Sequence, residues 1–340
     1  MNYLRTVLSL VCGALAFLAP AVWAADSQAK AEDFKSAYAE VNGIRMHYAS
    51  RGEGPLVLFL HGYPAFWYQW KDQMIEMART HRAVAPDLRG YNLTSRPAEV
   101  DAYAMKYLLE DVRQLVAHLN GNKKFILVGH DWGGAVAYTF AIKYPELVDK
   151  LIIINSGHPA LIEREFNENP VQQEASHYMM IMSGYTKEPP PPLPPDNRET
   201  AERRLKSGFI AREIEKGHYT EEDRELWISA YSQPGSNEAG INWYRANHAN
   251  PPFNSRVPAA NVKRSFSATE LVGANDLTVR VPHLVIWGLR DTALQTGLLS
   301  GLSKYAPGYR YKFYPDGDHW VFITHFKEVS RDIRDFIEGK

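Results

Sequence analysis

Cysteine is nearly absent from this chain of 340 residues, and the single one, Cys12, lies close to the N-terminus. If the N-terminal stretch is removed on export, the remaining protein has no thiol. It then has no disulfide, no thiolate metal site and no cysteine nucleophile. A chain of this length can bury enough apolar surface to fold without such cross-links.

The N-terminal stretch also lacks an apolar run long enough to cross a membrane. The run Val7–Leu18 is shorter than the roughly 20 residues that a spanning helix needs, and Pro20 follows it. Arg5 precedes the run and small residues close it at Ala24, which is typical of a cleaved signal peptide. We therefore predict that residues 1–24 are an export signal, that the protein is secreted or periplasmic, and that no stable membrane anchor remains after cleavage.

Charge of one sign is not in excess either, because 38 Lys and Arg face 39 Asp and Glu, for a formal net charge of −1. No general basic field therefore draws the chain to nucleic acid or to anionic lipid. The His, Asp and Glu residues show no metal-ligand spacing, so we expect no metal and no organic cofactor. The expected partners are a small-molecule substrate and water, and a homodimer is left open.

What the sequence does contain is an alternation of strand and helix patterns. Short, fully apolar runs suit strands that are buried on both faces, as in a mostly parallel sheet between helices. These runs are Leu56–Leu60, Ala83–Asp87, Phe125–Gly129, Leu151–Asn155 and His283–Trp287, with Ile44–Ser50 as an early antiparallel strand and Tyr311–Pro315 as the last strand. Helical patterns lie between them, for example over Met105–Leu119, Trp132–Tyr144 and Val321–Ile337. The sequence therefore predicts an α/β fold.

Residues 157–282 interrupt this alternation. They are richer in charge, proline and aromatic residues, and they contain no clear buried strand. We predict that residues 25–156 and 283–340 form the core domain, and that residues 157–282 form a mainly helical cap above the sheet.

A turn with an aspartate at its centre follows one of the buried strands: Gly-His-Asp-Trp-Gly-Gly, residues 129–134. In a strand–turn–helix elbow the central side chain, here Asp131, projects above the carboxyl end of the sheet. Gly129 and Gly133 permit the close backbone approach of such a turn. The positive end of the following helix favours an ionised carboxylate. We predict that Asp131 is a nucleophile rather than an inactive relic of a serine.

The ends of other strands supply the groups that such a nucleophile needs. The backbone N–H groups of Tyr63 and Trp132 are predicted to form an oxyanion hole. Asp291 follows a buried strand, and His319 lies in the loop before the last helix. The chain order of nucleophile, acid and histidine is that of α/β-hydrolase triads. His319 is therefore the predicted general base and Asp291 its charge-relay partner.

With these motifs the chain resembles the α/β-hydrolase superfamily and, within it, the epoxide hydrolases and haloalkane dehalogenases that use an aspartate nucleophile. The motifs His-Gly-Tyr-Pro, Gly-His-Asp-Trp-Gly-Gly, Val-Ile-Trp-Gly-Leu-Arg-Asp-Thr-Ala-Leu and Asp-Gly-Asp-His-Trp match in identity, order and spacing. Secreted bacterial epoxide hydrolases are the most similar group. The resemblance implies the α/β-hydrolase fold, with a mostly parallel eight-stranded sheet flanked by helices and an inserted helical cap.

The resemblance also implies two cap residues that protonate the opening epoxide. Gly-Ile-Asn-Trp-Tyr-Arg-Ala-Asn resembles the second-tyrosine motif and nominates Tyr244. Tyr178 is the candidate for the first tyrosine, with His177 as the alternative, since helix neighbours face different directions. Some relatives place the triad acid at the position of Asn155, and an asparagine there favours Asp291 as the acid.

We predict an epoxide hydrolase that opens an apolar epoxide to a vicinal diol, with His61, Trp132 and Trp243 in contact with the substrate. The aromatic and methionine side chains of the cap favour an apolar substrate. Two other functions stay open. One is a haloalkane or haloacetate dehalogenase with the same Asp-His-Asp triad. The other is a secreted, non-catalytic binding or virulence protein on a hydrolase scaffold.

Overall fold

The computed structural model describes residues 29–184, 192–206, 209–250 and 266–340. The predicted export signal, residues 1–24, lies outside the described residues, so signal cleavage and a secreted or periplasmic location stay predictions. No helix in the described part of the chain is long and apolar enough to cross a membrane.

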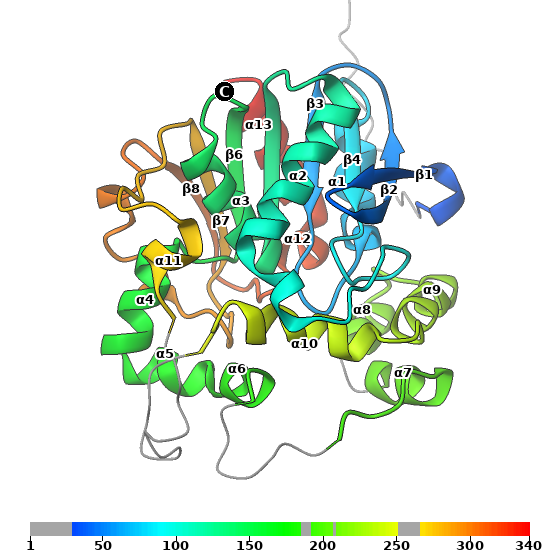
Figure 1. Cartoon of the computed structure of the whole chain (residues 1–340). Coiled ribbons are helices and arrows are strands. Elements are labelled where there is room, and N and C mark those ends of the chain that lie inside the picture. Colours follow the sequence, from blue (N-terminus) through cyan, green and yellow to red (C-terminus); the bar gives the residue numbers. More distant parts are fainter. Residues whose placement is uncertain (1–28, 185–191, 207–208, 251–265) are drawn as a thin grey trace, which may run out of the picture.

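The centre of the structure is a sheet of eight strands in the order β1-β2-β4-β3-β5-β6-β7-β8 (Figure 1). The strands are β1 (Lys35–Val41), β2 (Ile44–Arg51), β3 (Leu56–Leu60), β4 (Arg82–Pro86), β5 (Phe125–His130), β6 (Val148–Ile154), β7 (His283–Gly288) and β8 (Arg310–Tyr314). β2 pairs antiparallel with β1 and with β4, and the remaining pairs are parallel. The predicted eight-stranded, mostly parallel sheet is confirmed.

Helices cover both faces of the sheet. They are α1 (Lys71–Met77), α2 (Met105–Asn120), α3 (Trp132–Lys143), α12 (Val321–Thr324) and α13 (Phe326–Ile337). The side chains of α2 and α3 share one buried apolar cluster with Leu58 and Leu127, and those of α1, α12 and α13 share another with Val57 and Val128. Successive strand residues point to opposite faces. Because both faces are covered, the central strands β3 and β5 are buried along their whole length.

Two details of the core differ from the expectation. Strand β1 was not predicted, because Lys-Ser-Ala-Tyr-Ala-Glu-Val is weakly apolar and lies at the sheet edge, where most of its residues are at least partly exposed. The helix predicted over Val321–Ile337 is divided at His325, whose φ of −121° and ψ of 39° are not helical.

The segment between β6 and β7 is helical and, in its described residues, contains no strand. Its helices are α4 (Pro159–Glu168), α5 (Pro170–Ala175), α6 (His177–Met182), α7 (Arg198–Leu205), α8 (Phe209–Glu215), α9 (Glu221–Tyr231), α10 (Ser236–Ala246) and α11 (Ala268–Val272). Figure 1 shows α5, α6, α7 and α10 beyond one end of the sheet. Tyr244 of α10 packs against Trp132, which follows β5, so this end is the carboxyl end of the parallel strands. We propose that residues 157–282 are the cap predicted from the sequence.

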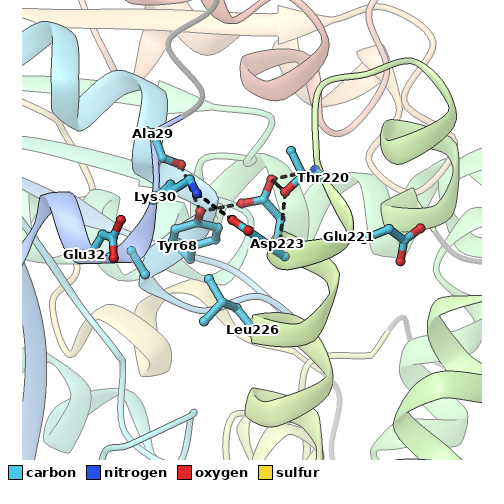
Figure 2. Close-up of a pocket in the computed structure, with 10 residues that line it drawn as sticks. Ala29, Lys30, Glu32, Tyr68, Thr220, Glu221, Asp223 and Leu226 are labelled. Atoms are coloured by element: carbon cyan, nitrogen blue, oxygen red, sulfur yellow. Dashed lines mark hydrogen bonds and ion pairs between the residues drawn. The ribbon is translucent and has the colours of Figure 1, made fainter.

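A buried ion pair joins the cap to the core. The Nζ atom of Lys71 lies 3.1 and 3.0 Å from the two carboxylate oxygens of Asp223, and the Tyr68 hydroxyl also donates to that carboxylate. Figure 2 shows Asp223 between Tyr68 and Thr220, with the exposed Lys30 nearby. Asp223 lies in the first turn of α9, so the start of this helix is held on the core.

Candidate active site

Asp131 stands at the elbow between β5 and α3, with a φ of 51° and a ψ of −121°. Few non-glycine residues adopt a positive φ, and aspartate is one of those that tolerate it best. Two glycines are required beside it. A Cβ on Gly62 would lie 2.4 Å from the Asp131 side chain, and one on Gly133 would lie 2.2 Å from the Leu60 carbonyl oxygen. The backbone therefore closes tightly around the carboxylate.

Two backbone N–H groups are directed at the Asp131 carboxylate. The Tyr63 N–H donates to Oδ1 at 2.8 Å, and the Trp132 N–H also donates to the carboxylate. Tyr63 is followed by a cis peptide bond to Pro64. Burial raises the pKa of Asp131 above its ordinary value, and the charge of His319 and the two N–H donors oppose that rise. The arrangement has the geometry of an oxyanion hole built around the enzyme's own carboxyl group.

His319 lies between two carboxylates. Its Nδ1 is 2.7 Å from Oδ2 of Asp291, and its Nε2 is 3.8 Å from Oδ2 of Asp131. Burial by itself lowers the pKa of His319, but the charge and hydrogen bond of Asp291, together with the charge of Asp131, outweigh it and raise the pKa to about 9. Near neutral pH the resting site therefore holds an imidazolium beside the Asp131 carboxylate.

Asp291 is itself tightly held. Its Oδ1 accepts from the N–H groups of Ala293 and Leu294 at 2.8 and 2.9 Å. Burial by itself raises the pKa of Asp291, and His319 together with the hydrogen-bond donors brings it below its ordinary value. The Asp291 carboxylate can therefore orient His319 and stabilise its charge.

Asn155 is a site residue whose contacts the sequence did not reveal. It is fully buried with a φ of 38°, its side-chain amide donates to Oδ2 of Asp291 at 2.8 Å, and its Oδ1 accepts from the Gly288 N–H at 2.9 Å. These two bonds join the carboxyl ends of β6 and β7. Asn155 is thus positioned to orient the acid, and only the proximity of the two strand ends could have indicated this.

We expect Asn155→Gly to lower kcat by about tenfold to a hundredfold, because Asp291 loses a hydrogen bond to its charge and holds His319 less firmly. Glycine is unstrained at a positive φ, so backbone strain does not contribute. The acid limb of the pH–kcat profile should also move to higher pH, because Asp291 without the Asn155 donor binds the protonated His319 more strongly and raises the pKa of His319 further. Asn122→Gly, at an exposed position with a φ of 61°, is the matched control. An unchanged pH profile would contradict an orienting role.

Tyr178 and Tyr244 meet on the cap side of Asp131. Their ring centroids are 6.3 Å apart, and a hydrogen bond joins their side chains. Burial raises the pKa of both hydroxyls well above 10, and the Asp131 carboxylate raises it further. Both therefore remain protonated donors at physiological pH. The structure brings Tyr178 rather than the alternative His177 to Tyr244, and among the described residues Nδ1 of His177 has no hydrogen-bond partner.

Tyr244 is held in place by two aromatic rings of the core. Its ring makes edge contacts with those of Tyr63 and Trp132, at centroid distances of 5.5 and 5.1 Å. Both partners are the residues whose N–H groups donate to Asp131. The position of the Tyr244 hydroxyl is therefore tied to that of these two N–H groups.

An apolar cavity opens at Asp131. The described residues that line it are Asp131, Trp132, Ala135, Ser156, Pro159, Ile162, Phe166, Met179, Ala249, Phe266, Leu271 and Leu294. Of the three residues predicted to contact substrate, Trp132 lies here. The structure does not bring the other two to this cavity.

His61 and Trp243 are fully buried for structural reasons. His61 contacts the Gly62 carbonyl through Nδ1 and accepts from the Leu88 N–H through Nε2, and burial lowers its pKa to about 4. The Trp243 Nε1–H donates to the Arg89 carbonyl at 3.0 Å, and its ring packs behind Trp132. His61 joins the loops that follow β3 and β4, and Trp243 joins α10 to the loop after β4, which corrects the prediction of direct substrate contact.

Size alone does not locate the site. A larger hollow of about 730 Å³ lies at the Lys30 and Asp223 surface in Figure 2. It is lined mainly by charged and polar side chains, and none of the triad residues borders it. Within the described ranges, no group of three or more His, Cys, Asp or Glu side chains could hold a metal ion.

Comparison with known proteins gives a consistent result. The chain matches the α/β-hydrolase fold family over residues 55–326. Epoxide hydrolase 1 of Caenorhabditis elegans is 34% identical over 313 residues, which cover 90% of this chain and 71% of that protein. The AB hydrolase superfamily protein YfhM of Bacillus subtilis is 32% identical over 309 residues, which cover 90% of this chain and 99% of that protein. A Bacillus megaterium epoxide hydrolase solved with an inhibitor has a TM-score of 0.74 and 30% identity, over 89% of this chain and 100% of that one.

Proposed function

This chain belongs to the α/β-hydrolase fold family and is a hydrolase of the epoxide hydrolase kind, and from this premise we propose that it opens an apolar epoxide through a covalent ester on Asp131. The observation that carries the proposal is the surroundings of one carboxylate. Two N–H donors face Asp131, His319 lies 3.8 Å away, and two tyrosine hydroxyls lie on the cap side.

The first step is attack of Asp131 on an epoxide carbon. Oδ1 is engaged by the Tyr63 N–H, so Oδ2 is the oxygen that attacks. As the new C–O bond forms, the epoxide C–O bond breaks and its electron pair goes to the epoxide oxygen. That oxygen takes a proton from Tyr178 or Tyr244, while the second tyrosine donates a hydrogen bond to it. The product is a hydroxyalkyl ester of Asp131 and a tyrosinate.

The second step is hydrolysis of that ester. Once the ester has formed, the Nε2 proton of His319 passes to solvent, from which His319 regains it at the end of the cycle. The neutral imidazole takes a proton from water through Nε2, and the resulting hydroxide attacks the carboxyl carbon of Asp131. Negative charge develops on Oδ1, where the N–H groups of Tyr63 and Trp132 stabilise it. Collapse of this intermediate releases the diol, whose oxygen is protonated by His319. The proton left by hydrolysis returns to the tyrosinate, and the aspartate is regenerated.

Ester formation also prepares His319 to act as a base. The Asp131 carboxylate is one of the groups that raise the pKa of His319, and the ester no longer carries that charge. The pKa of His319 therefore falls below about 9 once the ester has formed. We expect the rate of ester hydrolysis in a single turnover to rise with pH and to level off with an apparent pKa below 9. Rapid-quench measurements across this pH range test it, and a pH-independent rate would exclude His319 as the base.

The tyrosine pair distinguishes epoxide opening from dehalogenation. We expect Tyr178→Phe or Tyr244→Phe to slow ester formation from an epoxide by about tenfold to a hundredfold, and the double variant to slow it by about a thousandfold or more, because the leaving oxygen loses its acid. A bromoalkane, whose leaving halide needs no proton, is the control substrate. Tyr107→Phe, at an exposed position on α2, is the control variant. Turnover of bromoalkanes alone, unaffected by the double variant, would assign the protein to the dehalogenases.

A further inference from the structure

The loop that carries His319 contacts the cap as well as the core. It comprises residues 315–320, between β8 and α12, and we call it the base loop. On its core side, Nε2 of His130 donates to the His319 carbonyl at 2.9 Å, and the ring centroids of His130 and His319 lie 4.5 Å apart. His130 directly precedes Asp131 in the chain. The base loop is therefore fixed to the strand that carries the nucleophile.

On its cap side, the base loop packs against helix α8. The ring of Phe209, the first residue of α8, lies flat on the ring of Trp320, with the centroids 3.7 Å apart and an angle of 10° between the planes. Trp320 is buried and directly follows His319 in the chain. Arg212, further along the same helix, lies 3.6 Å from the Asp318 carboxylate, which is a weaker contact because both side chains are partly exposed. Helix α8 therefore covers the base loop next to the catalytic histidine.

Phe209 is held from another side by Trp227 of α9. Their rings meet edge to face with the centroids 5.3 Å apart, and Trp227 is fully buried. Trp227 also packs against Phe66, in the loop after β3, at a centroid distance of 4.9 Å. The start of α9 is joined to the core through Asp223. Phe209 thus lies between an anchored part of the cap and Trp320 of the base loop.

The place of Trp320 bears directly on the orientation of His319. The two rings meet edge to face, with the centroids 5.4 Å apart and an angle of 89° between the planes. The hydrogen bond from Nδ1 to Asp291, at 2.7 Å, fixes only one side of the imidazole. Nε2 on the other side has to be directed at a water molecule beside the Asp131 carboxyl carbon. A misplacement of about 1 Å in such an arrangement can slow a reaction by roughly a hundredfold.

We propose that Phe209 is a positioning residue for the general base: through Trp320, it holds His319 in the orientation that ester hydrolysis requires. The inference rests on the proposed two-step epoxide hydrolysis and adds a cap residue to its second step. Ester formation does not use His319 as a base, because Asp131 attacks directly and the cap tyrosines supply the proton. Loss of the Phe209 ring therefore slows the second step and leaves the first step unchanged.

The test measures both steps of a single turnover by rapid quench, with the purified protein and a styrene-type epoxide. Phe209→Ala should slow ester hydrolysis by about tenfold to a hundredfold, while ester formation keeps the wild-type rate and shows that the variant is folded. Phe209→Tyr keeps the ring and should hydrolyse the ester at nearly the wild-type rate. Ile214→Ala is the matched control, because Ile214 belongs to the same helix and packs, partly buried, against the same apolar cluster as Phe209. It should leave both rates nearly unchanged.

Three results would overturn the inference. The first is a Phe209→Ala variant that hydrolyses the ester at the wild-type rate. The second is a Phe209→Ala variant in which both steps slow equally, since Phe209 would then act only in cap packing. The third is a Phe209→Tyr or Ile214→Ala variant that hydrolyses the ester as slowly as Phe209→Ala, since the stack on Trp320 would then not be the cause. In all three cases the wild type still forms and hydrolyses the ester, so the proposed function stands. A wild-type protein that forms no ester would contradict the proposed function itself.

Discussion

His319→Ala is expected to stop the reaction after its first chemical step, with the substrate fragment still bound to Asp131. The nucleophile, the two N–H donors and the tyrosines remain in the variant, so the ester can form. The base that activates water is gone, so hydrolysis should slow by about ten-thousandfold or more. Intact-protein mass spectrometry after a single turnover should show the mass of protein plus epoxide, and peptide mapping should locate it on Asp131.

Asp131→Asn is the matched control for this measurement. Asparagine has the same shape and tolerates the positive φ of the elbow, so the fold is kept while the nucleophile is lost. No adduct should form on it from either a styrene-type epoxide or a bromoalkane. An adduct on His319→Ala from the bromoalkane alone would point to a dehalogenase. No adduct from any of a modest panel would favour a binding protein on this scaffold.

The second large effect concerns stability. Lys71→Met should lower the free energy of unfolding by roughly 3–5 kcal/mol, because it leaves a buried carboxylate at Asp223 without its counter-ion. The side chains of Lys71 and Asp223 are only 3% and 4% exposed. The midpoint of urea unfolding, followed by fluorescence, measures the loss. Lys71 and Asp223 join the cap to the core, so we expect enzymatic activity to fall in proportion to the fraction of folded protein.

Two further variants identify the cause of that effect. Lys71→Met combined with Asp223→Asn removes both charges and should recover most of the lost stability. Lys30→Met removes an exposed lysine that pairs with Glu222 in the same region, and its unfolding midpoint should match the wild type. If the double variant is no more stable than Lys71→Met, then the apolar contacts of the Lys71 side chain, and not its charge, stabilise the contact between cap and core.

Much of the catalytic arrangement could be predicted because it depends on strand ends. Asp131 and Asp291 each follow a short apolar run, and the loop of His319 follows the last predicted strand. The carboxyl ends of parallel strands meet at one edge of the sheet. Local pattern and chain order were therefore enough to bring these residues together. The same reasoning places Tyr63 beside Asp131.

Residues that act through packing between distant segments were not predictable in the same way. His61 and Trp243 have the residue types of a substrate pocket, yet tertiary hydrogen bonds to the backbone turn both inward. Asn155 appeared only as a missing acid, and its contact with Asp291 depends on the spacing of β6 and β7.

The sequence by itself determined the α/β fold, the inserted helical segment and the order in which nucleophile, acid and base follow the strands. These properties depend on hydrophobic periodicity and on turn chemistry, which act over a few residues. Only the tertiary structure decided whether Tyr178 or His177 meets Tyr244, and how Asp291 is held. Those outcomes depend on the rotation of each helix and on contacts between segments far apart in the chain, and no local pattern encodes them.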